Sequence, residues 1–403
     1  MPSFSTTDKV DFLLIGAGIV GLSLARELRR QFPQQSLLLL EKENQVGIHA
    51  SGRNSGVLHS GIYYPEESVK FQICASGAKE LFAYCQEHAL PVARMGKLIL
   101  APTAEQESQF TVFQQRAARL GITAERLLPA EVGKIEPAAR ACAGLYLPDT
   151  AVIQSKTVLQ ALLGELQNDP RVTLCFNSRV QQIDLQQGLL QTAQKNYAFG
   201  MLFNAAGAHV DRIAHQCQVG LEYTMLPFRG RYFQLSEQAD LPIRGLIYPV
   251  PDSRMPFLGI HFTRSLEGKI WVGPSAMPAL GREHYQGSRG IEARDAGNIA
   301  LHLSRLLAGN VQGLAQHAWR ELHTLRRSGF AEAAAALVPG VRSHHLVPCG
   351  KVGIRPQLYN KRENRLEMDF KILRSNRSLH ILNSISPAFT SSFAFARLAL
   401  QDL

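Results

Sequence analysis

A glycine-rich turn near the start of the chain constrains its fold more than any other feature. Gly16, Gly18 and Gly21 follow the pattern G-x-G-x-x-G, between an apolar run at residues 10–15 and a helical pattern at residues 19–31. The first glycine permits a tight turn, the second lets the backbone approach a diphosphate, and the third allows the helix to pack closely on the strand. The sequence therefore predicts a βαβ unit that binds a dinucleotide.

A second buried strand at residues 36–40 completes this unit, and Glu41 closes it 20 residues after Gly21. A carboxylate at this place accepts hydrogen bonds from a ribose diol. The motif alone does not distinguish NAD from FAD. Two further segments favour FAD: the glycine- and serine-rich residues 47–61 are longer than an NAD domain needs here, and the small side chains of residues 204–207 allow a second approach to the cofactor.

Composition limits the class of protein. The chain has 403 residues, of which 45% are hydrophobic and 19% charged, and this balance is typical of a globular protein with two or three cores. Its net charge is +10, yet no basic block stands out, so we expect no nucleic-acid partner. No apolar run reaches the roughly 18 residues of a membrane span. Asp11 and three glycines interrupt the stretch at residues 10–24, which argues against a signal peptide.

The six cysteines are isolated from one another, and no cysteines or histidines have the spacing of a metal site. Isolated cysteines in a long chain are typical of proteins whose thiols stay reduced. We therefore expect a cytoplasmic protein without a bound metal.

Two kinds of strand pattern occur later in the chain. Residues 170–210 and 375–400 repeat the alternation of strand and helix, and residues 290–337 have a helical pattern. Short strands separated by turn residues, as in an antiparallel sheet, are predicted at residues 231–235, 246–249, 257–262 and 269–272. The predicted fold class is α/β (α+β overall), with a Rossmann-like FAD-binding domain and an inserted, mainly antiparallel substrate domain that carries helices. The predicted FAD-binding domain spans residues 8–90, 145–225 and 340–403, and the substrate-binding domain spans residues 91–144 and 226–339.

Residues 54–64 read Asn-Ser-Gly-Val-Leu-His-Ser-Gly-Ile-Tyr-Tyr. Together with the glycine turn and Glu41-Lys42, this segment resembles the glycine-oxidase/D-amino-acid-oxidase superfamily of FAD enzymes. The chain is more narrowly similar to L-2-hydroxyglutarate dehydrogenases and oxidases, over nearly its whole length. Further stretches that carry this resemblance are residues 227–233, 247–252, 256–264 and 353–355. The resemblance implies FAD-dependent oxidation of L-2-hydroxyglutarate, or a close 2-hydroxy acid, to the 2-oxo acid by hydride transfer to flavin N5.

The motifs and the resemblance together predict which residues hold FAD. They are Gly16, Gly18, Ile19, Val20, Gly21, Glu41, Lys42, Ser51, Asn54, Ser55, Gly56, Val57, His59, Val180, Ala206, Gly207, Gly353, Arg355, Pro387, Ala388, Phe389 and Thr390.

Oxidation of a secondary alcohol requires a base for the hydroxyl proton while a hydride leaves the carbon. Histidine suits this task because its pKa lies near neutrality. We favour His261 as the base because it lies on a predicted strand of the inserted domain. His59, in the glycine- and serine-rich segment, is the other candidate.

A dicarboxylate substrate requires cations. Arg355 is predicted to bind a carboxylate, because a guanidinium group binds carboxylates in a bidentate manner and the superfamily uses the arginine of its Gly-x-Arg-Pro pattern in this way. Arg229 and Arg264 are candidates for the distal carboxylate, with surface salt bridges as the alternative for each. Tyr64 and Tyr248 are candidate hydroxyl donors, with core packing as the alternative.

Several alternatives stay open. One is an amino- or imino-acid oxidase with the same hydride geometry, and another is a catalytically silent flavin-binding protein. Either oxygen or a quinone can serve as the electron acceptor. The arginine-containing helical residues 290–327 are either an ordinary solvated amphipathic segment or a peripheral contact with the inner face of a membrane.

Overall fold

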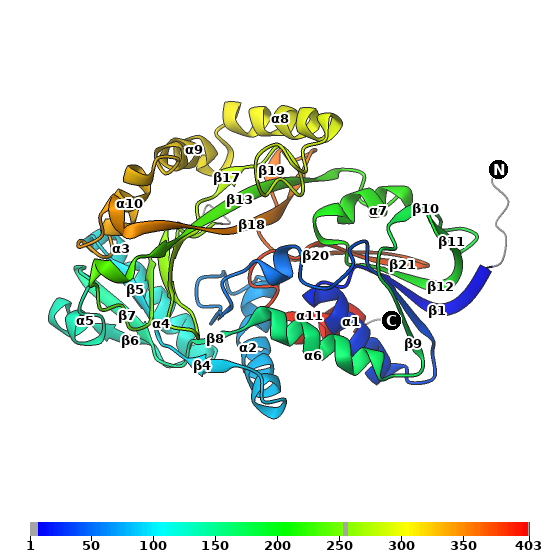
Figure 1. Cartoon of the computed structure of the whole chain (residues 1–403), viewed down its shortest axis with the longest axis horizontal. Coiled ribbons are helices and arrows are strands. Elements are labelled where there is room, and N and C mark those ends of the chain that lie inside the picture. The colour runs from blue at the N-terminus through cyan, green and yellow to red at the C-terminus, as the bar shows by residue number, and fades with distance from the viewer. Residues whose placement is uncertain (1–6, 253–256, 402) are drawn as a thin grey trace.

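The computed structural model of the chain describes residues 7–252, 257–401 and 403, so Pro256 of the 256–264 stretch lies outside the described residues. Two β-sheets stand side by side, each with its own helices (Figure 1). The predicted first unit is present as β1 (Thr7–Ile15), α1 (Ile19–Gln31) and β2 (Leu37–Leu40). Strand β2 consists of four buried leucines, as expected for a parallel strand that is covered on both faces.

The first lobe contains an eight-stranded sheet in which β1, β2 and their neighbours run parallel. Its further strands are β9 (Val172–Cys175), β10 (Val180–Asp184), β11 (Leu189–Thr192), β12 (Asn196–Asn204), β20 (Lys371–Ser375) and β21 (Ser378–Asn383). Its helices are α1, α2 (Val69–Glu87), α6 (Ser155–Gln167), α7 (Val210–Gln216) and α11 (Ser392–Leu400). Helices α1, α6 and α11 pack on one face of the sheet and α7 packs on the other, which gives the parallel strands an apolar core on both sides.

The second lobe contains a ten-stranded, mainly antiparallel sheet. Its strands are β5 (Lys97–Ala101), β6 (Glu125–Leu127), β7 (Ala143–Leu147), β13 (Tyr223–Leu235), β14 (Leu246–Pro249), β15 (His261–Arg264), β16 (Ile270–Gly273), β17 (Met277–Pro278), β18 (Leu346–Asn360) and β19 (Arg365–Leu366). Its helices are α3 (Ala104–Glu107), α4 (Gln109–Arg119), α5 (Pro129–Ile135), α8 (Ala293–Ala308), α9 (Leu314–His323) and α10 (Arg327–Ala335). A three-stranded sheet of β3 (Val57–Leu58), β4 (Val92–Arg94) and β8 (Ala151–Ile153) completes the strands described.

The large sheet crosses the predicted domain boundaries. Strand β18 pairs along the whole of β13, from Leu346 opposite Leu235 to Asn360 opposite Tyr223, although residues 340–403 were predicted in the FAD-binding domain. Strand β7 likewise spans the predicted boundary at residue 145. Prolines and glycines interrupt the apolar pattern of β18, so no strand was predicted there.

Candidate active site

The glycine turn has the geometry that the motif predicts. Gly16 has a φ of +101°, and a Cβ atom there would lie 2.5 Å from the carbonyl oxygen of Ala205. A Cβ atom at Gly21 would lie 1.8 Å from the carbonyl oxygen of Gly16. Helix α1 begins beyond this turn without a side-chain cap and without an acidic residue in its first turn. Apart from the Ile19 N–H, which donates to the Ser51 hydroxyl, the N–H groups of its first turn and its positive dipole end are therefore available to an anion.

Two predicted cofactor residues lie against this turn. The Glu41 carboxylate accepts hydrogen bonds from the N–H groups of Ala17 at 2.8 Å and Glu43 at 2.9 Å. The Ser51 hydroxyl accepts a hydrogen bond from the Ile19 N–H at 3.0 Å, next to Gly18. The carboxylate keeps further lone pairs for a ribose diol, since an ionised carboxylate has about four acceptor sites.

The glycine- and serine-rich segment is held in shape by one side chain. Asn54 accepts hydrogen bonds from the Gly56 N–H at 2.8 Å and the Ser155 hydroxyl at 2.6 Å, and it donates to the Ser51 carbonyl at 2.6 Å. Gly56 has a φ of +75°, which a residue with a side chain rarely adopts. The neighbouring Ser55 hydroxyl accepts a hydrogen bond from the Val57 N–H at 3.5 Å.

The predicted C-terminal cofactor residues meet this segment. The Thr390 hydroxyl donates to the carbonyl of Val57 and accepts from the N–H of His59, each at 3.2 Å. Pro387, Ala388 and Phe389 precede it in the same turn. Residues more than 300 positions apart in the sequence therefore form one wall of the site.

The remaining predicted cofactor residues lie at three other places. Ala206 and Gly207 follow directly on Ala205, beside the glycine turn. Val180 begins β10, two residues after Ser178, whose N–H donates to the carbonyl of Glu41 at 2.8 Å. A Cβ atom at Gly353 of β18 would lie 2.9 Å from the carbonyl oxygen of Arg53, so the large sheet contacts the glycine- and serine-rich segment.

A segment of the second lobe, residues 279–291, lies across residues that flank the cofactor turn. Glu283 lies 2.7 Å from Lys42 Nζ and 2.8 Å from His209 Nε2. The Tyr285 hydroxyl lies 2.9 Å from His49 Nδ1. This strap was not predicted from the sequence, because its residues match no motif and lie far along the chain from the residues that they contact.

One group of potential metal ligands occurs among the described residues, and one of its members, Glu283, belongs to this strap. Atoms of Glu43, His49 and Glu283 come within 4.8 Å of one another. Lys42 Nζ already forms ion pairs with the carboxylates of Glu43 and Glu283. The lysine ammonium therefore already supplies a positive charge to these two carboxylates. The expected absence of a metal stays a prediction.

One face of the ten-stranded sheet carries the candidate catalytic residues. Side chains alternate between the two faces along a strand, and residues paired across strands share a face. The strand register therefore puts Lys97, Tyr248, His261 and Arg355 on one face. Other residues of this face are Tyr232, Thr263, Lys351 and Gly353. The opposite face is apolar and packs on α5 and α10.

His261 is a neutral imidazole with a defined tautomer. Its Nδ1 lies 2.8 Å from the carbonyl oxygen of Gly259, and a carbonyl only accepts, so Nδ1 carries the hydrogen and Nε2 keeps its lone pair. The ring stacks on Tyr248, with centroids 4.0 Å apart. Burial lowers the pKa of His261 to about 3 against the opposing hydrogen bond to Gly259, and the charges of Arg355 and Lys97 lower it further. The ring is therefore neutral at physiological pH and keeps a free lone pair on Nε2, although its pKa lies well below the near-neutral value expected of a catalytic base.

His59 faces the same region from the first lobe. Burial lowers its pKa to about 3, and the charges of Lys97 and His261 act in the same direction. Its carbonyl accepts a hydrogen bond from the Cys74 thiol at 3.2 Å. Within the described chain no residue hydrogen-bonds its ring, so its tautomer is not fixed as that of His261 is.

Two buried cations share this face of the sheet. Lys97 is fully buried, and burial lowers its pKa to about 8. Arg355 has an Nη1 atom that is buried without a hydrogen-bond partner among the described residues. The sequence analysis identified Arg355 but missed Lys97. Its signal was present, because Lys97 is the one charged residue in the otherwise apolar run at residues 97–101.

Three other predicted substrate residues lie elsewhere. The alternation of β15 puts Arg264 on the opposite face, where its guanidinium lies 3.5 Å from the carbonyl of Ile243. Arg229 is also on the face opposite to Arg355, and its Nη1 lies 3.4 Å from His284 Nε2. The ring of Tyr64 lies 5.3 Å from the Lys70 ammonium at the start of α2. The structure therefore does not bring these three side chains into the cluster around His261.

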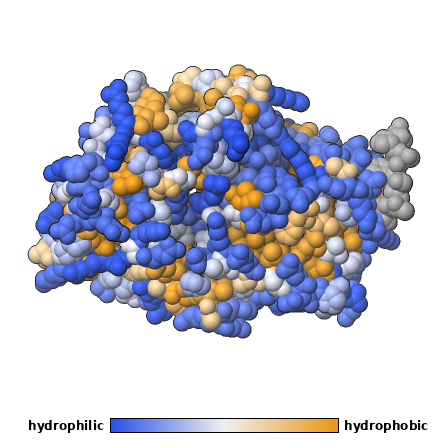
Figure 2. Space-filling model, in the orientation of Figure 1, coloured by the Kyte–Doolittle hydropathy of each residue, from blue (hydrophilic) through white to orange (hydrophobic). Residues whose placement is uncertain are grey.

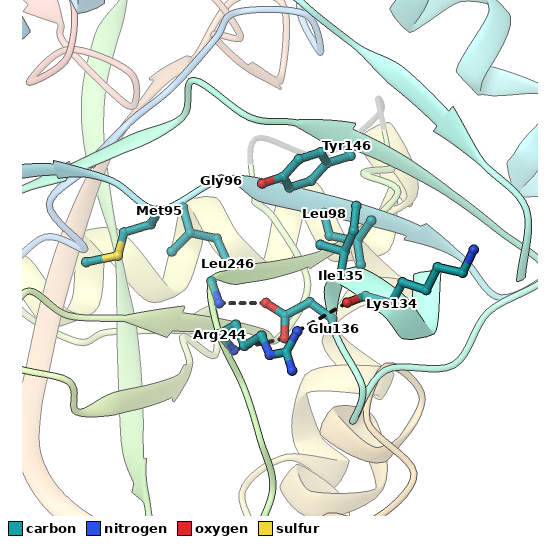
Figure 3. Close-up of a pocket in the computed structure, with 10 residues that line it drawn as sticks. Met95, Gly96, Leu98, Lys134, Ile135, Glu136, Tyr146, Arg244 and Leu246 are labelled. Carbon is teal, nitrogen blue, oxygen red and sulfur yellow. Dashed lines mark hydrogen bonds between the residues drawn. The ribbon is translucent and has the colours of Figure 1, made fainter. Parts of the chain in front are cut away.

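A pocket of about 300 Å³ lies against β5, and Figure 3 shows residues that line it. Gly96 and Leu98 line it, so the side chain of Lys97 between them points to the opposite face. Its Glu136 carboxylate is satisfied by the N–H groups of Arg244 at 2.9 Å and Gly245 at 2.6 Å. The one carboxylate that lines this pocket is therefore already occupied by backbone donors.

Comparison with known proteins identifies the family of the chain. The profile described as FAD dependent oxidoreductase (DAO) matches residues 11–401. The chain belongs to this family of FAD-dependent oxidoreductases. It is 31% identical over 392 residues to L-2-hydroxyglutarate dehydrogenase of Indibacter alkaliphilus, covering 95% of this chain and 96% of the relative. It is 30% identical over 423 residues to the mitochondrial L-2-hydroxyglutarate dehydrogenase of Homo sapiens, covering 99% and 89%.

Solved structures share the fold of this FAD-dependent oxidoreductase. L-alpha-glycerophosphate oxidase of Mycoplasma pneumoniae with FAD bound superposes with a TM-score of 0.76 at 21% identity, covering 98% of this chain and 94% of that one. Glycine oxidase of Geobacillus kaustophilus gives a TM-score of 0.70 at 16% identity, covering 98% and 95%. The predicted fold class, cofactor and enzyme class are therefore confirmed.

The residues of the chain fit FAD. The uncapped N-terminus of α1 and the turn at Gly16, which has no room for a Cβ atom, suit a diphosphate. The Glu41 carboxylate beside this turn suits a ribose diol. The wall formed by Val57 and Thr390 continues from the same segment toward the face of the large sheet. We therefore expect FAD to run from the glycine turn toward that face.

Proposed function

We propose that this chain oxidises L-2-hydroxyglutarate, or a closely related 2-hydroxy acid, to the corresponding 2-oxo acid. Relatives named L-2-hydroxyglutarate dehydrogenase, at 30–31% identity over at least 95% of the chain, support this choice of substrate. The observation that carries the proposal is the free Nε2 of His261, on the sheet face that also holds the buried cations Lys97 and Arg355.

His261 acts as the base in the proposed reaction. Its Nε2 accepts the proton of the substrate hydroxyl, and the Gly259 carbonyl holds Nδ1–H so that the ring keeps this orientation. The hydrogen on the same carbon leaves with its electron pair, and the CH–OH group becomes a carbonyl. Bound FAD supplies the acceptor for that hydride. Arg355 binds the carboxylate next to the reacting carbon, for which its unpartnered Nη1 is available.

Replacing the proposed base tests this function. We expect His261→Ala to slow anaerobic flavin reduction by L-2-hydroxyglutarate by ~10²–10⁴-fold, the usual range for a lost general base. Stopped-flow absorbance of the holoenzyme measures this rate. His323→Ala, at an exposed histidine of α9, is the matched control and should reduce at the wild-type rate. A near-normal rate in the His261 variant would remove this residue from the role and favour His59.

We further propose that the reduced enzyme passes its electrons to a quinone or to oxygen, and that α8 and α9 contact an anionic membrane surface. None of the helices in the described chain is long and apolar enough to span a membrane. Apolar side chains nevertheless reach the surface along the top of the molecule, where these two helices lie (Figure 2). Exposed apolar residues of this region are Leu301, Leu307, Trp319, Leu322 and Leu325. Arginines of the same helices complement an anionic headgroup.

A further inference from the structure

Lys97 is a buried ammonium group without a hydrogen-bond acceptor among the described residues. Its nearest neighbours are aromatic: Nζ lies 4.8 Å from the centre of the Tyr63 ring and 5.4 Å from the centre of the Tyr248 ring. Cation–π contacts offset part of the cost of burying the charge, but less than an ion pair does. The site is therefore poised to receive an anion.

The titratable groups around Lys97 do not supply that anion. Burial raises the pKa of the Cys74 thiol to about 12, so this group is neutral at physiological pH. Burial also raises the pKa values of the Tyr63 and Tyr248 hydroxyls, so both phenols stay protonated. The Tyr63 hydroxyl is itself buried without a hydrogen-bond partner in the described chain. Lys97 Nζ and the hydroxyls of the two rings beside it, Tyr63 Oη and Tyr248 Oη, are therefore three buried donors without an acceptor among the described residues.

Arg355 is the second cation near the same histidines. Five strand steps of ~4.8 Å separate β18 from β5, which is roughly 24 Å across a flat sheet. The charges of both cations nevertheless lower the pKa of His261. Both side chains are long, and both project from the same face of the sheet as His261. The charge of Lys97 also lowers the pKa of His59. The proposed base therefore lies between two cations that approach it from opposite directions along the sheet.

The carboxylate of Glu321, whose charge raises the pKa of Arg355, leaves the guanidinium free to bind an acid. Glu321 acts on the pKa of Arg355, but its carboxylate accepts a hydrogen bond from the N–H of Ala276 at 2.6 Å. Arg355 Nη1 makes no hydrogen bond in the described chain.

We infer that Lys97, together with the Tyr63 hydroxyl, binds the distal carboxylate of a dicarboxylic 2-hydroxy acid, while Arg355 binds the carboxylate beside the reacting carbon. This inference rests on the proposed function and adds its selectivity: the enzyme prefers dicarboxylates to monocarboxylates of the same length. The carboxylate accepts a charge-assisted hydrogen bond from the ammonium group, which the aromatic rings beside Nζ do not provide. Lys97 therefore replaces Arg229 and Arg264, which were the candidates from sequence, as the residue that binds the distal carboxylate.

Lys97→Met tests this role, because it keeps the length of the side chain and removes its charge. In the holoenzyme we expect the KM for L-2-hydroxyglutarate to rise by roughly 10- to 100-fold, the range for a lost hydrogen bond to a charged group. The KM for L-2-hydroxypentanoate, which lacks the distal carboxylate, should change by less than about threefold. A similar loss with both substrates, or no loss with either, would overturn the inference.

Lys351→Met is the matched control. Lys351 is another lysine on this face, but its ammonium lies 4.7 Å from the Trp271 ring and 5.2 Å from the Tyr232 ring. We expect this variant to keep the wild-type ratio of the two KM values. Equal loss of dicarboxylate preference in both variants would show a general effect of charge and would contradict a specific site at Lys97.

Binding of unreactive acids separates this inference from the proposed function. Glutarate and pentanoate are titrated into wild-type and Lys97→Met holoenzyme, and perturbation of the flavin absorbance reports binding. We expect wild type to bind glutarate more tightly and the variant to lose that preference. If wild type does not oxidise L-2-hydroxyglutarate but shows this pattern, the proposed function fails and the dicarboxylate site stands. If wild type oxidises it and shows no preference for glutarate, the inference fails alone.

Discussion

At the scale of single residues, burial sets the protonation states of the site. His261 and His59 have pKa values lowered to about 3, so both are neutral at physiological pH and either accepts a proton without first losing one. The hydrogen bond from Nδ1 of His261 to the Gly259 carbonyl distinguishes the two, because it leaves Nε2 as the acceptor. A histidine at this position was predictable from sequence, but its tautomer depends on a backbone carbonyl that only the folded loop supplies.

A pH dependence belongs to this scale. Lys97 has a pKa lowered to about 8, so it is cationic below that pH and loses its charge above it. We expect kcat/KM for L-2-hydroxyglutarate to be constant from about pH 6 to 7, to be halved near pH 8, and to fall further as the pH rises, since the free ammonium is being lost. Steady-state kinetics with L-2-hydroxypentanoate should lack this fall, and so should Lys97→Met with the dicarboxylate. A profile for L-2-hydroxyglutarate that stays flat to pH 10 would contradict the assignment.

At the scale of elements, the apolar pattern predicted the bounds of an element correctly where one face of that element is uniformly apolar. Helix α1 spans Ile19–Gln31, as its periodicity predicts. Strand β13 is longer than predicted and begins at Tyr223 rather than Arg231, and β15 begins at His261 rather than Phe257. These strands carry polar site residues on one face, together with prolines and glycines, so the usual alternation of apolar and polar residues is missing.

Close packing of α1 on the glycine turn gives a prediction at this scale. Gly21→Ala brings a Cβ atom to 1.8 Å from the Gly16 carbonyl oxygen, so we expect stability to fall by at least ~1–3 kcal/mol and FAD to dissociate more readily. Thermal unfolding followed by circular dichroism measures the first effect, and flavin fluorescence on dilution measures the second.

Gly164→Ala is the matched control, because it lies within α6 and its Cβ atom would meet no atom within 4 Å. We expect this variant to gain ~0.5–1 kcal/mol, since alanine is the better helix former. A Gly21 variant as stable as wild type would contradict the close approach of helix and turn.

At the scale of the whole molecule, the site forms where the lobes meet. The first lobe contributes the diphosphate turn and the second contributes the sheet face, and the strap at residues 279–291 joins them through Glu283 and Lys42. The motifs predicted each part separately. They did not predict that Lys97 shares a face with His261 while Arg264 does not, because this depends on strand order and register between distant segments.

The surface of α8 and α9 gives a prediction at the same scale. Trp319 is 76% exposed, and Leu322 lies one helical turn further on the same side. We expect the holoenzyme to sediment with phosphatidylglycerol vesicles, and Trp319→Ser combined with Leu322→Ser to reduce the bound fraction several-fold. Leu128→Ser, at an exposed leucine next to α5, should have no effect. Equal binding of all three proteins would contradict a membrane contact at this surface.

Anaerobic bleaching of the flavin tests the central claim most directly. Holoenzyme is mixed without oxygen with L-2-hydroxyglutarate, its D enantiomer, L-2-hydroxypentanoate, glycine and L-glutamate, and the visible flavin absorbance is followed. We predict rapid bleaching by L-2-hydroxyglutarate, slower bleaching by the monocarboxylate only at high concentration, and none by the amino acids. Bleaching by an amino acid and by no 2-hydroxy acid would contradict the account and identify an amino-acid oxidase instead.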